Sequence, residues 1–234
     1  MDKNDLPILR ITADDIDGDG NYTGTYETDG YGYYCGNIEI AADLHNVKFA
    51  ANLLVRGNIV AKAGSGIEAG SGIKAGSGIE AGWGIKAGSG IEAGLGIKAG
   101  LGIKAGSGIK AGWGIEAGWG IEAGLGIKAG SGIKAGWGIE AGWGIKAGSG
   151  IEAGWGIEAG LGIKAGSGIE AGLGIKAGLA ITAKWLSTRL RIFAGVCIWR
   201  LPKPEETQIC AELRDGVIAF GTHVPPTKSA EVAA

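Results

Sequence analysis

Isoleucine recurs every six residues from Ile67 to Ile181, and this spacing dominates the pattern of apolar and polar positions along the chain. Between residues 63 and 182, twenty consecutive units follow the pattern Ala-Gly-x-Gly-Ile-(Glu/Lys), the last one ending in Ala180, Ile181 and Thr182. The variable position x holds only Ser, Leu or Trp. A strict short period gives each unit the same backbone environment as the next, so it predicts a solenoid or a fibre.

Each hexapeptide is long enough for a short strand and a corner. Side chains alternate along a strand, so Ile is expected to point inward and the neighbouring Glu or Lys outward. Three such sides close a triangle, and the next turn stacks about 4.8 Å above in parallel pairing. Glycine at two positions is expected to allow corners with positive φ and close approach of backbones. We therefore predict an all-β fold, a single-stranded parallel β-helix with three hexapeptides per turn and a cap at each end.

Two other glycine-rich classes do not fit the repeat. Collagen needs Gly at every third position and abundant Pro, whereas this tract has Gly at positions two and four of six and no Pro. A flexible linker lacks regularly placed apolar residues, whereas here a β-branched residue recurs throughout.

Changes in composition divide the chain into four regions. Residues 1–36 are expected to form an acidic Tyr/Gly-rich N-terminal cap, and residues 37–182 the hexapeptide-repeat β-helix of roughly seven to eight turns. The helix is placed from residue 37 because degenerate units containing Val47, Leu53 and Ile59 precede the strict array. Residues 183–223 alternate as several strands and are expected to form a β-rich C-terminal cap, followed by a flexible tail over 224–234.

The residues at x are expected to face the interior. In four of five consecutive blocks of three from residue 83 onward, one Ser, one Leu and one Trp occur together. A closed interior layer of fixed volume would require such a balance. The alternative is that x projects from the corner, which would leave six Trp and six Leu side chains as a long apolar surface.

The unit Ile-Glu-Ala-Gly-Ser-Gly resembles the hexapeptide of left-handed parallel β-helix proteins, in which an aliphatic residue opens the unit and three units make a turn. The resemblance covers residues 37–182, with Trp and Leu at a position that the family keeps small. The run Leu53-Leu-Val-Arg-Gly-Asn-Ile-Val-Ala-Lys62 also looks like bactofilins, the right-handed β-helical filament formers. The two resemblances imply opposite hands, so the sequence leaves the hand open.

The outward positions from Glu68 to Lys176 hold nine Glu and ten Lys in mixed order. We interpret them as a solubility surface, since opposite charges on adjacent turns avoid like-charge stacking. The formal net charge of the chain is -2, so it carries no strong overall field toward nucleic acid or membrane. Residues 1–46, however, contain ten acidic residues against two basic ones, and residues 184–203 contain five basic residues and no acidic one.

The acidic head contains the candidate binding residues. Asp15-Ile-Asp-Gly-Asp-Gly20 matches the start of a calcium loop, but position twelve, which should be Glu, is Tyr26. We interpret the run as an Asp/Gly turn between short strands and predict no metal and no cofactor. All five tyrosines fall in the same head, and Tyr offers a rigid apolar body with a polar tip at interfaces. The predicted partner-binding residues are Asp14, Asp15, Asp17, Asp19, Tyr22, Tyr26, Tyr31, Tyr33 and Tyr34.

The chain offers little for catalysis. The left-handed β-helix resemblance implies trimeric acyltransferases with a histidine general base and protruding loops, but His45 and His223 both lie outside the strict array, which has no insertion. Ice binding on solenoids relies on arrays of Thr, which the repeat lacks. Cys35, Cys197 and Cys210 are too few and too far apart for a disulfide framework or a zinc site, which indicates buried thiols in a reducing compartment.

The sequence predicts a non-catalytic β-solenoid scaffold or binding protein. The most specific form is a phage or mobile-element inhibitor whose acidic head competes for the basic surface of a nucleic-acid-binding host complex. The alternatives are a self-assembling filament or fibre protein, as the bactofilin resemblance implies, and an acyltransferase-like enzyme. A protein partner and possible homo-oligomers are expected, and no membrane. With no signal-peptide pattern at the N-terminus, the expected location is the cytoplasm, that of the host cell if the protein is phage-encoded.

Overall fold

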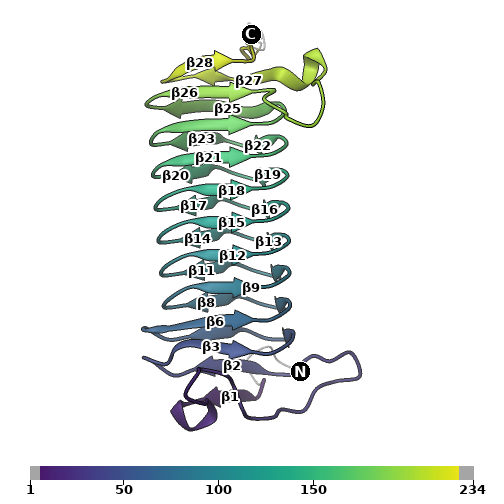
Figure 1. The fold of residues 1–234 in the computed structure, drawn as a ribbon, viewed down its shortest axis with the longest axis vertical. Helices are drawn as coiled ribbons and strands as arrows, with labels where there is room; N and C mark the ends of the chain where they lie inside the picture. Colours follow the sequence, from purple (N-terminus) through teal and green to yellow (C-terminus); the bar gives the residue numbers. More distant parts are fainter. Residues whose placement is uncertain (1–5, 227–234) are drawn as a thin grey trace, which may run out of the picture.

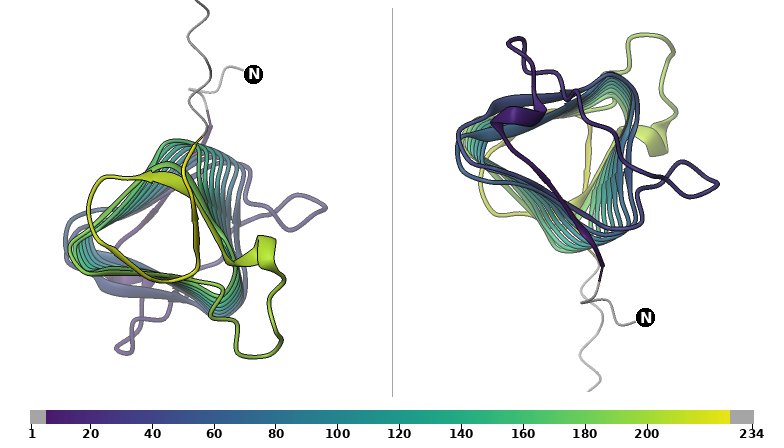
Figure 2. Two further views of the ribbon diagram at one scale, coloured as in Figure 1. Left: turned by 90° about the horizontal axis from the view of Figure 1, so that it is seen from above. Right: turned by 90° about the horizontal axis from the view of Figure 1, so that it is seen from below.

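A computed structural model describes residues 6–226, which form a parallel β-solenoid with a triangular cross-section (Figures 1 and 2). Strands pair with those eighteen positions away along the chain, so that Ile91 lies between Ile73 and Ile109 in one ladder. This register confirms the turn of three hexapeptides. Parallel pairing without a long crossover is possible because each coil returns to its starting side after three corners.

The three sides of the triangle are called faces 1, 2 and 3. Face 1 contains β4(Leu53–Val55), β7(Ile73–Ala75), β10(Ile91–Ala93), β13(Ile109–Ala111), β16(Ile127–Ala129), β19(Ile145–Ala147), β22(Ile163–Ala165) and β29(Thr222–Val224). Face 2 contains β1(Ile8–Ile11), β2(Asn37–Ile40), β5(Ile59–Ala61), β8(Ile79–Ala81), β11(Ile97–Ala99), β14(Ile115–Ala117), β17(Ile133–Ala135), β20(Ile151–Ala153) and β23(Gly168–Ala171). β25(Ile181–Thr188) and β27(Gln208–Leu213) each cross from face 1 to face 2.

Face 3 contains one strand per coil. Its members are β3(His45–Phe49), β6(Ser65–Ala69), β9(Ile85–Ala87), β12(Ile103–Ala105), β15(Ile121–Ala123), β18(Ile139–Ala141), β21(Gly156–Ala159), β24(Gly174–Ala177), β26(Arg191–Ala194) and β28(Val217–Phe220). These strands form one ten-stranded sheet, so the rod has about ten coils rather than seven to eight. The corners are named by the faces that they join: 2/3, 3/1 and 1/2.

The solenoid extends beyond residues 37–182 at both ends. At the N-terminal end, β1 pairs in register with β2, Asn21 bridges to Lys48 and Tyr34 bridges to Val55. These three contacts form one further coil on faces 2, 3 and 1, with long loops and the short 3₁₀ turn η1(Ala13–Asp15) between them. At the other end, β25 to β29 pair in parallel with the preceding coils, and a loop with η2(Pro204–Thr207) interrupts them.

Stacked Ile and Ala side chains fill the interior of the rod. In nearly every strand of the strict array the Ile and the Ala are buried, whereas the charged residue between them faces solvent. Burying apolar area in this way is the main favourable contribution to folding. The predicted inward position of Ile and the outward position of the neighbouring Glu or Lys are therefore confirmed. No helix among residues 6–226 is long and apolar enough to cross a membrane, and the predicted tail lies outside the described residues from 227 onward.

The expectation that x faces inward is wrong. Trp113, Trp119, Trp137, Trp143 and Trp155 are all exposed, from 47% for Trp137 to 63% for Trp113. Strict alternation continued through the corner would place x inside, but the chain turns between the two glycines, and x emerges at the vertex. Ser65 is the exception, with a buried hydroxyl that accepts from the Leu44 N–H at 2.9 Å and donates to the Ala41 carbonyl at 2.7 Å.

The glycines of the repeat act through close packing rather than through positive φ. Within residues 63–182, Gly64 alone has a positive φ. A Cβ on the first glycine of a unit, such as Gly130, would overlap the carbonyl oxygen of Gly112 in the adjacent coil. A Cβ on the second glycine, such as Gly132, would lie 3.5 Å from the Gly150 carbonyl, which is an ordinary contact. The first glycine is therefore required by the spacing of the coils.

Candidate binding surfaces

Three tyrosines of the head pack together on the first coils. The ring of Tyr22 lies 5.4 Å from that of Phe49 and 6.1 Å from that of Tyr26, and Tyr26 lies edge-on to Tyr34 at 5.7 Å. Burial raises the pKa of the Tyr22 and Tyr26 hydroxyls. The Tyr22 N–H also donates to the Lys48 carbonyl and the Tyr34 N–H to the Leu54 carbonyl, which pairs the exposed edges of β3 and β4. These tyrosines cover the end of the rod.

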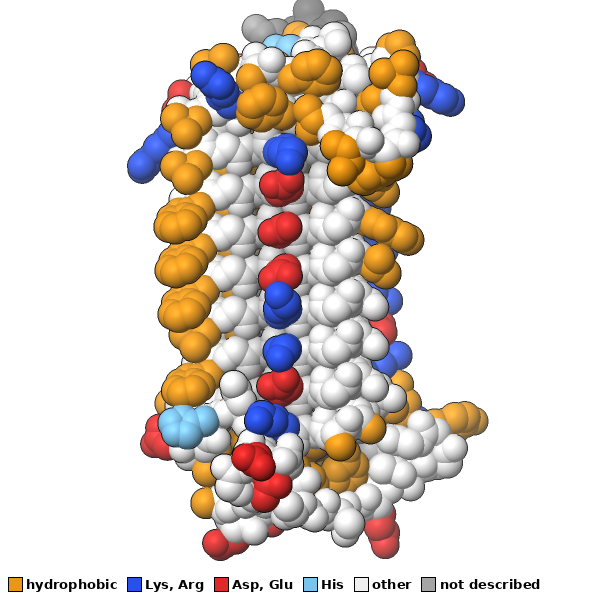
Figure 3. All heavy atoms as spheres, viewed as in Figure 1, with side chains coloured by type: hydrophobic (Ala, Val, Ile, Leu, Met, Phe, Trp, Pro, Cys, Tyr) orange, Lys and Arg blue, Asp and Glu red, His pale blue; other side chains and the backbone are white. Residues whose placement is uncertain are grey.

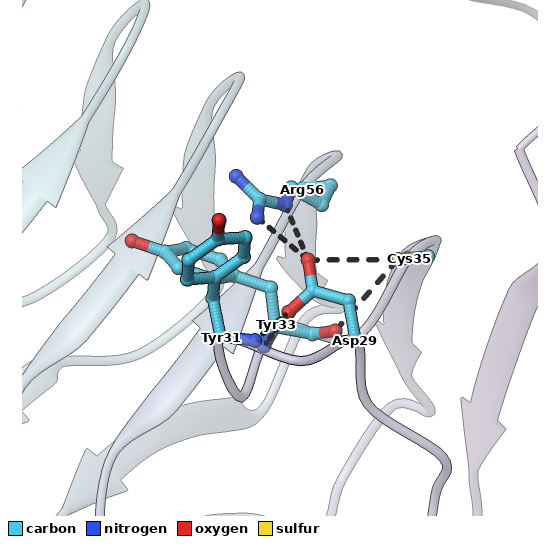
Figure 4. A network of polar contacts seen from close by, with 5 residues as sticks. All are labelled: Asp29, Tyr31, Tyr33, Cys35 and Arg56. Atoms are coloured by element: carbon cyan, nitrogen blue, oxygen red, sulfur yellow. Dashed lines mark hydrogen bonds and ion pairs between the residues drawn. The ribbon is translucent and has the colours of Figure 1, made fainter.

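The other two tyrosines belong to a loop that Asp29 organises (Figure 4). One carboxylate oxygen of Asp29 accepts from the N–H groups of Tyr31 and Tyr33 at 2.9 Å, and the other pairs with Arg56 at 2.6 Å. The hydrogen bond from Arg56 lowers the pKa of Asp29. Arg56 also lies 4.0 Å above the Tyr33 ring. The Tyr31 side chain is 82% exposed and thus projects into solvent from an ordered loop.

The four predicted aspartates divide into two pairs. Asp15 accepts from the N–H and hydroxyl of Thr12, and Asp17 accepts from the N–H groups of Asp19 and Asn21 and from the Asn21 side chain. The Asn21 side chain is the main cause of the lowered pKa of Asp17. The predicted Asp/Gly turn is confirmed, because Ile16 and Tyr22 form an antiparallel bridge around it. The carboxylates of Asp14 and Asp19 are exposed to solvent.

The histidines lie at opposite ends of the rod. The exposed His45 ring packs 5.0 Å from that of Trp83, and His223 on β29 contacts the Ala211 carbonyl at 2.8 Å. Within residues 6–226, no three His, Cys, Asp or Glu side chains converge as metal ligands would. All three cysteines are free thiols, and the expectation that they are buried is wrong, because Cys35 is exposed and the other two are half-buried.

An apolar ridge follows the 2/3 corner (left edge of Figure 3). Its residues stack in successive coils through N–H to carbonyl hydrogen bonds. Trp119, Trp137 and Trp155 stack almost parallel, with centroids 5.3 and 5.2 Å apart. The ring faces therefore cover one another, and the ring edges form a straight exposed line. The ridge contains Trp83, Leu101, Trp119, Trp137, Trp155, Leu173 and Leu190.

The other corners differ from this ridge. The 3/1 corner begins with serines and continues as Leu125, Trp143, Leu161 and Leu179. Two loops project from it, residues 23–33 at one end of the rod and residues 195–207 at the other (Figures 1 and 2). The 1/2 corner includes Trp113 and ends in the column Ser131, Ser149, Ser167 and Lys184.

Charge is unevenly divided among the faces, so the expected alternation of opposite charges on adjacent coils holds on part of the surface only. In the strict array, face 1 carries Lys74, Glu92, Lys110, Lys128, Lys146 and Lys164. Face 2 carries Glu80, Lys98, Glu116, Lys134, Glu152 and Glu170. Face 3, whose charged column runs down the centre of Figure 3, carries Glu68, Lys86, Lys104, Glu122, Glu140, Glu158 and Lys176. Opposite charges alternate along most of face 2, where Lys134 pairs with Glu152 at 2.9 Å. Like charges are stacked in register over the last coils of face 1.

The structure thus separates the nine predicted residues by role. Tyr22, Tyr26, Tyr34, Asp15 and Asp17 hold the head together, and Tyr33 packs against Arg56. Tyr31, Asp14 and Asp19 remain exposed to a partner. The corner ridges and the lysines of face 1 were not predicted as binding sites. Residues eighteen positions apart lie on adjacent coils, so listing every eighteenth residue of the array would have collected the residues of each ridge and of the lysine column.

Comparisons with protein-family models, with curated proteins and with solved structures found no significant match.

Proposed function

We propose that this protein is a non-catalytic scaffold that binds a protein partner along the apolar ridge of its 2/3 corner. The observation that carries the proposal is the exposed stack of Trp119, Trp137 and Trp155. Soluble monomers rarely expose long continuous apolar patches unless these bind something. Since the ring faces are covered by neighbouring indoles, the ridge is suited to the groove of a protein rather than to stacking against sugar rings.

The ridge can be tested by protein capture from a bacterial lysate on the immobilised full chain. Trp119→Ser, Trp137→Ser and Trp155→Ser in one variant remove the stack, and the matched control is Ser131→Ala, Ser149→Ala and Ser167→Ala on the 1/2 corner. We expect a protein that the wild type and the control retain and the tryptophan variant loses. Retention by all three, or by none, would contradict the proposal.

The head gives the scaffold a second, end-on contact in this proposal. The ordered loop that exposes Tyr31, and the exposed carboxylates of Asp14 and Asp19, support the hypothesis of a partner with a basic surface, including a host complex attacked by a phage inhibitor. Asp14→Asn, Asp19→Asn and Tyr31→Ala leave the contacts of the turn and the tyrosine cluster intact. If this triple variant captures the partner protein as well as the wild type does, the head does not contribute to binding.

End-to-end assembly, as in the filament hypothesis, is favoured by one observation. The last strands, β28 and β29, expose Val217, Phe220 and Val224 at the C-terminal end of the rod. Exposed strand edges with apolar side chains promote association. Sedimentation velocity at rising protein concentration distinguishes open polymerisation from a discrete small species.

A further inference from the structure

The charged column of face 3 is complementary to its own reverse (centre of Figure 3). From the N-terminal end, the ladder pairs place its residues in the order Glu68, Lys86, Lys104, Glu122, Glu140, Glu158 and Lys176. Reversal sets Glu68 against Lys176, Lys86 against Glu158 and Lys104 against Glu140, and only the central Glu122 meets its own copy. The other faces lack this property, because face 1 carries a single glutamate and face 2 has glutamates at both ends of its column.

Glu140 is the carboxylate of this column that the fold leaves without a cation. Glu122 and Glu158 lie directly beside it on the adjacent coils. These two pair within the chain, with Lys104 at 2.8 Å and with Lys176 at 2.5 Å. Among residues 6–226, no ion pair involves Glu140, which is exposed. Since like charges directly opposite in a sheet are destabilising, a cation from outside the chain would stabilise this position.

The centre of the charged column is also the centre of the rod. Glu122 lies on β15, and five strands of face 3 follow β15 toward the C-terminal end. Four strands and the bridge between Asn21 and Lys48 precede it. Two rods related by a two-fold axis at Glu122 therefore overlap along their whole length when they run antiparallel. Parallel rods related by a two-fold axis would place every charge against its own copy, so the charges select the antiparallel arrangement.

The apolar ridge of the 2/3 corner borders the same surface. An elongated hollow of about 900 Å³ follows face 3, and its lining includes the charged column and the ridge residues Trp83, Leu101, Trp119, Trp137 and Trp155. The rotation that brings face 3 against face 3 in antiparallel rods keeps each corner on its own side, so the two ridges meet along one rim. There Trp83 lies level with Trp155 of the second copy, and Trp119 with its own copy. Tryptophan is enriched at protein interfaces.

The two ends of face 3 are complementary as well. A hollow of about 810 Å³ at the C-terminal end has a basic and apolar lining that includes Leu173, Lys176, Arg189, Arg191, Phe193 and Val217. At the N-terminal end, the turn over residues 12–21 carries the exposed carboxylates of Asp14 and Asp19. Figure 2 shows this turn projecting from the triangle on the side of face 3. In antiparallel rods the acidic turn of one copy reaches the basic hollow of the other.

A second projecting segment lies at the opposite end and the opposite corner. The loop over residues 195–207 projects on the same side of the triangle as the acidic turn (Figure 2). It is ordered by the pair of Arg200 and Glu206 at 2.6 Å, and its Ile198 and Leu201 are both 92% exposed. In antiparallel rods this loop lies beside the N-terminal end of the second copy, where Tyr31 is 82% exposed. A contact between copies explains why an ordered loop exposes these apolar side chains.

We propose that this protein forms an antiparallel homodimer through face 3, with a two-fold axis at Glu122. A two-fold interface uses the same surface patch on both copies, and that patch must be complementary to itself. Face 3 meets this condition in its charges, its ridge and its ends. The inference goes beyond the proposed function and does not rest on it, because the dimer joins the two ridges into one broader apolar rim for the protein partner.

Sedimentation velocity with reversed charges tests the interface. The wild-type chain should sediment as a dimer. Lys104→Glu or Glu140→Lys alone sets like charges opposite each other twice per dimer, and should raise the dissociation constant about tenfold or more. The double variant, and an equimolar mixture of the two single variants, should restore the dimer. The matched controls Lys98→Glu and Glu116→Lys on face 2 should dimerise as the wild type does. A monomeric wild type, or a mixture that stays monomeric, would overturn the proposal, and circular dichroism verifies folding.

Crosslinking tests the orientation of the rods. The background for this test replaces Cys35, Cys197 and Cys210 by Ser. In this background, Glu122→Cys faces its own copy, and a short bismaleimide should join the two chains because packed sheets lie about 10 Å apart. Glu68→Cys lies six coils, or about 29 Å, from its copy along the rod and should not be joined. Equal crosslinking at both positions would indicate parallel rods, and either that result or no crosslinking at Glu122→Cys would refute the antiparallel dimer.

The dimer and the proposed function can fail separately, because the charge variants leave every ridge residue in place. A monomeric wild type that captures a lysate protein through its ridge would refute the dimer and keep the proposed function. A dimeric wild type that captures no lysate protein would keep the dimer and refute the proposed function.

Discussion

Trp119 and Trp137, eighteen residues apart in the chain, stack with their ring planes within 5° of each other. Trp155 continues the stack on the next coil. The repeat places identical side chains on successive coils at one corner, and the hydrogen bonds from the Trp137 N–H to the Trp119 carbonyl and from the Trp155 N–H to the Trp137 carbonyl hold them in line. The stack therefore contributes to the stability of the corner as well as to its exposed surface.

Trp137→Ala removes both ring contacts at once and should lower the free energy of unfolding by about 1 to 3 kcal/mol. Trp143→Ala, an exposed indole outside the stack, is the control and should cost less. Thermal unfolding measures the difference, and near-ultraviolet circular dichroism should lose the signal of coupled indoles only in the first variant. Equal effects of the two substitutions would mean that the stack does not form.

Substituting alanine for each of the two glycines of one hexapeptide should have different effects on stability. Gly130→Ala forces a Cβ against the Gly112 carbonyl oxygen, and should destabilise the rod by about 3 kcal/mol or more because neither backbone can yield. Gly132→Ala meets only an ordinary contact and should change stability by less than about 1 kcal/mol. Chemical denaturation of both variants compares them, and the opposite order would contradict the packing of the coils.

Ser65 and Ser149 occupy the same position of the hexapeptide in different environments. Ser65→Ala leaves the Leu44 N–H and the Ala41 carbonyl without their partner, and should cost about 1 to 3 kcal/mol of stability. Ser149 is exposed, so Ser149→Ala should be neutral. The two unfolding midpoints provide the measurement, and a neutral Ser65→Ala would indicate that the hydroxyl is not buried.

The stability of the Asp29 loop should depend on pH in the acidic range. Its carboxylate has a pKa below the ordinary 3.8, chiefly through the hydrogen bond from Arg56, so its stabilising effect is complete above the unfolded pKa. That effect is lost as the pH falls through the lowered folded value. The amide chemical shifts of Tyr31 and Tyr33 should titrate with a midpoint below 3.8, and Asp29→Asn should abolish the titration. A midpoint at or above 3.8 would exclude the ion pair.

The fold was predictable because every hexapeptide repeats the same local pattern of apolar, charged and glycine positions. Ile67 and its equivalents alternate with charged residues, which defines strands, and the period of six closes a three-sided coil. The contact between Asp29 and Arg56 was not predictable, because it joins positions 27 residues apart across an irregular loop. The balance of Ser, Leu and Trp in blocks of three pointed to the wrong orientation at x, because a count of side-chain volumes does not show that the chain turns at that position.

The sequence by itself determined the parallel β-solenoid, its coil of three hexapeptides, and the burial of Ile and Ala, because these depend only on a short local period. The tertiary structure decided that the tryptophans face outward and that the head forms an additional coil held by Tyr22, Tyr26 and Tyr34. It also brought Lys128, Lys146 and Lys164 into one column. These features depend on where the chain bends and on which residues lie one coil apart, and both are set by packing in three dimensions.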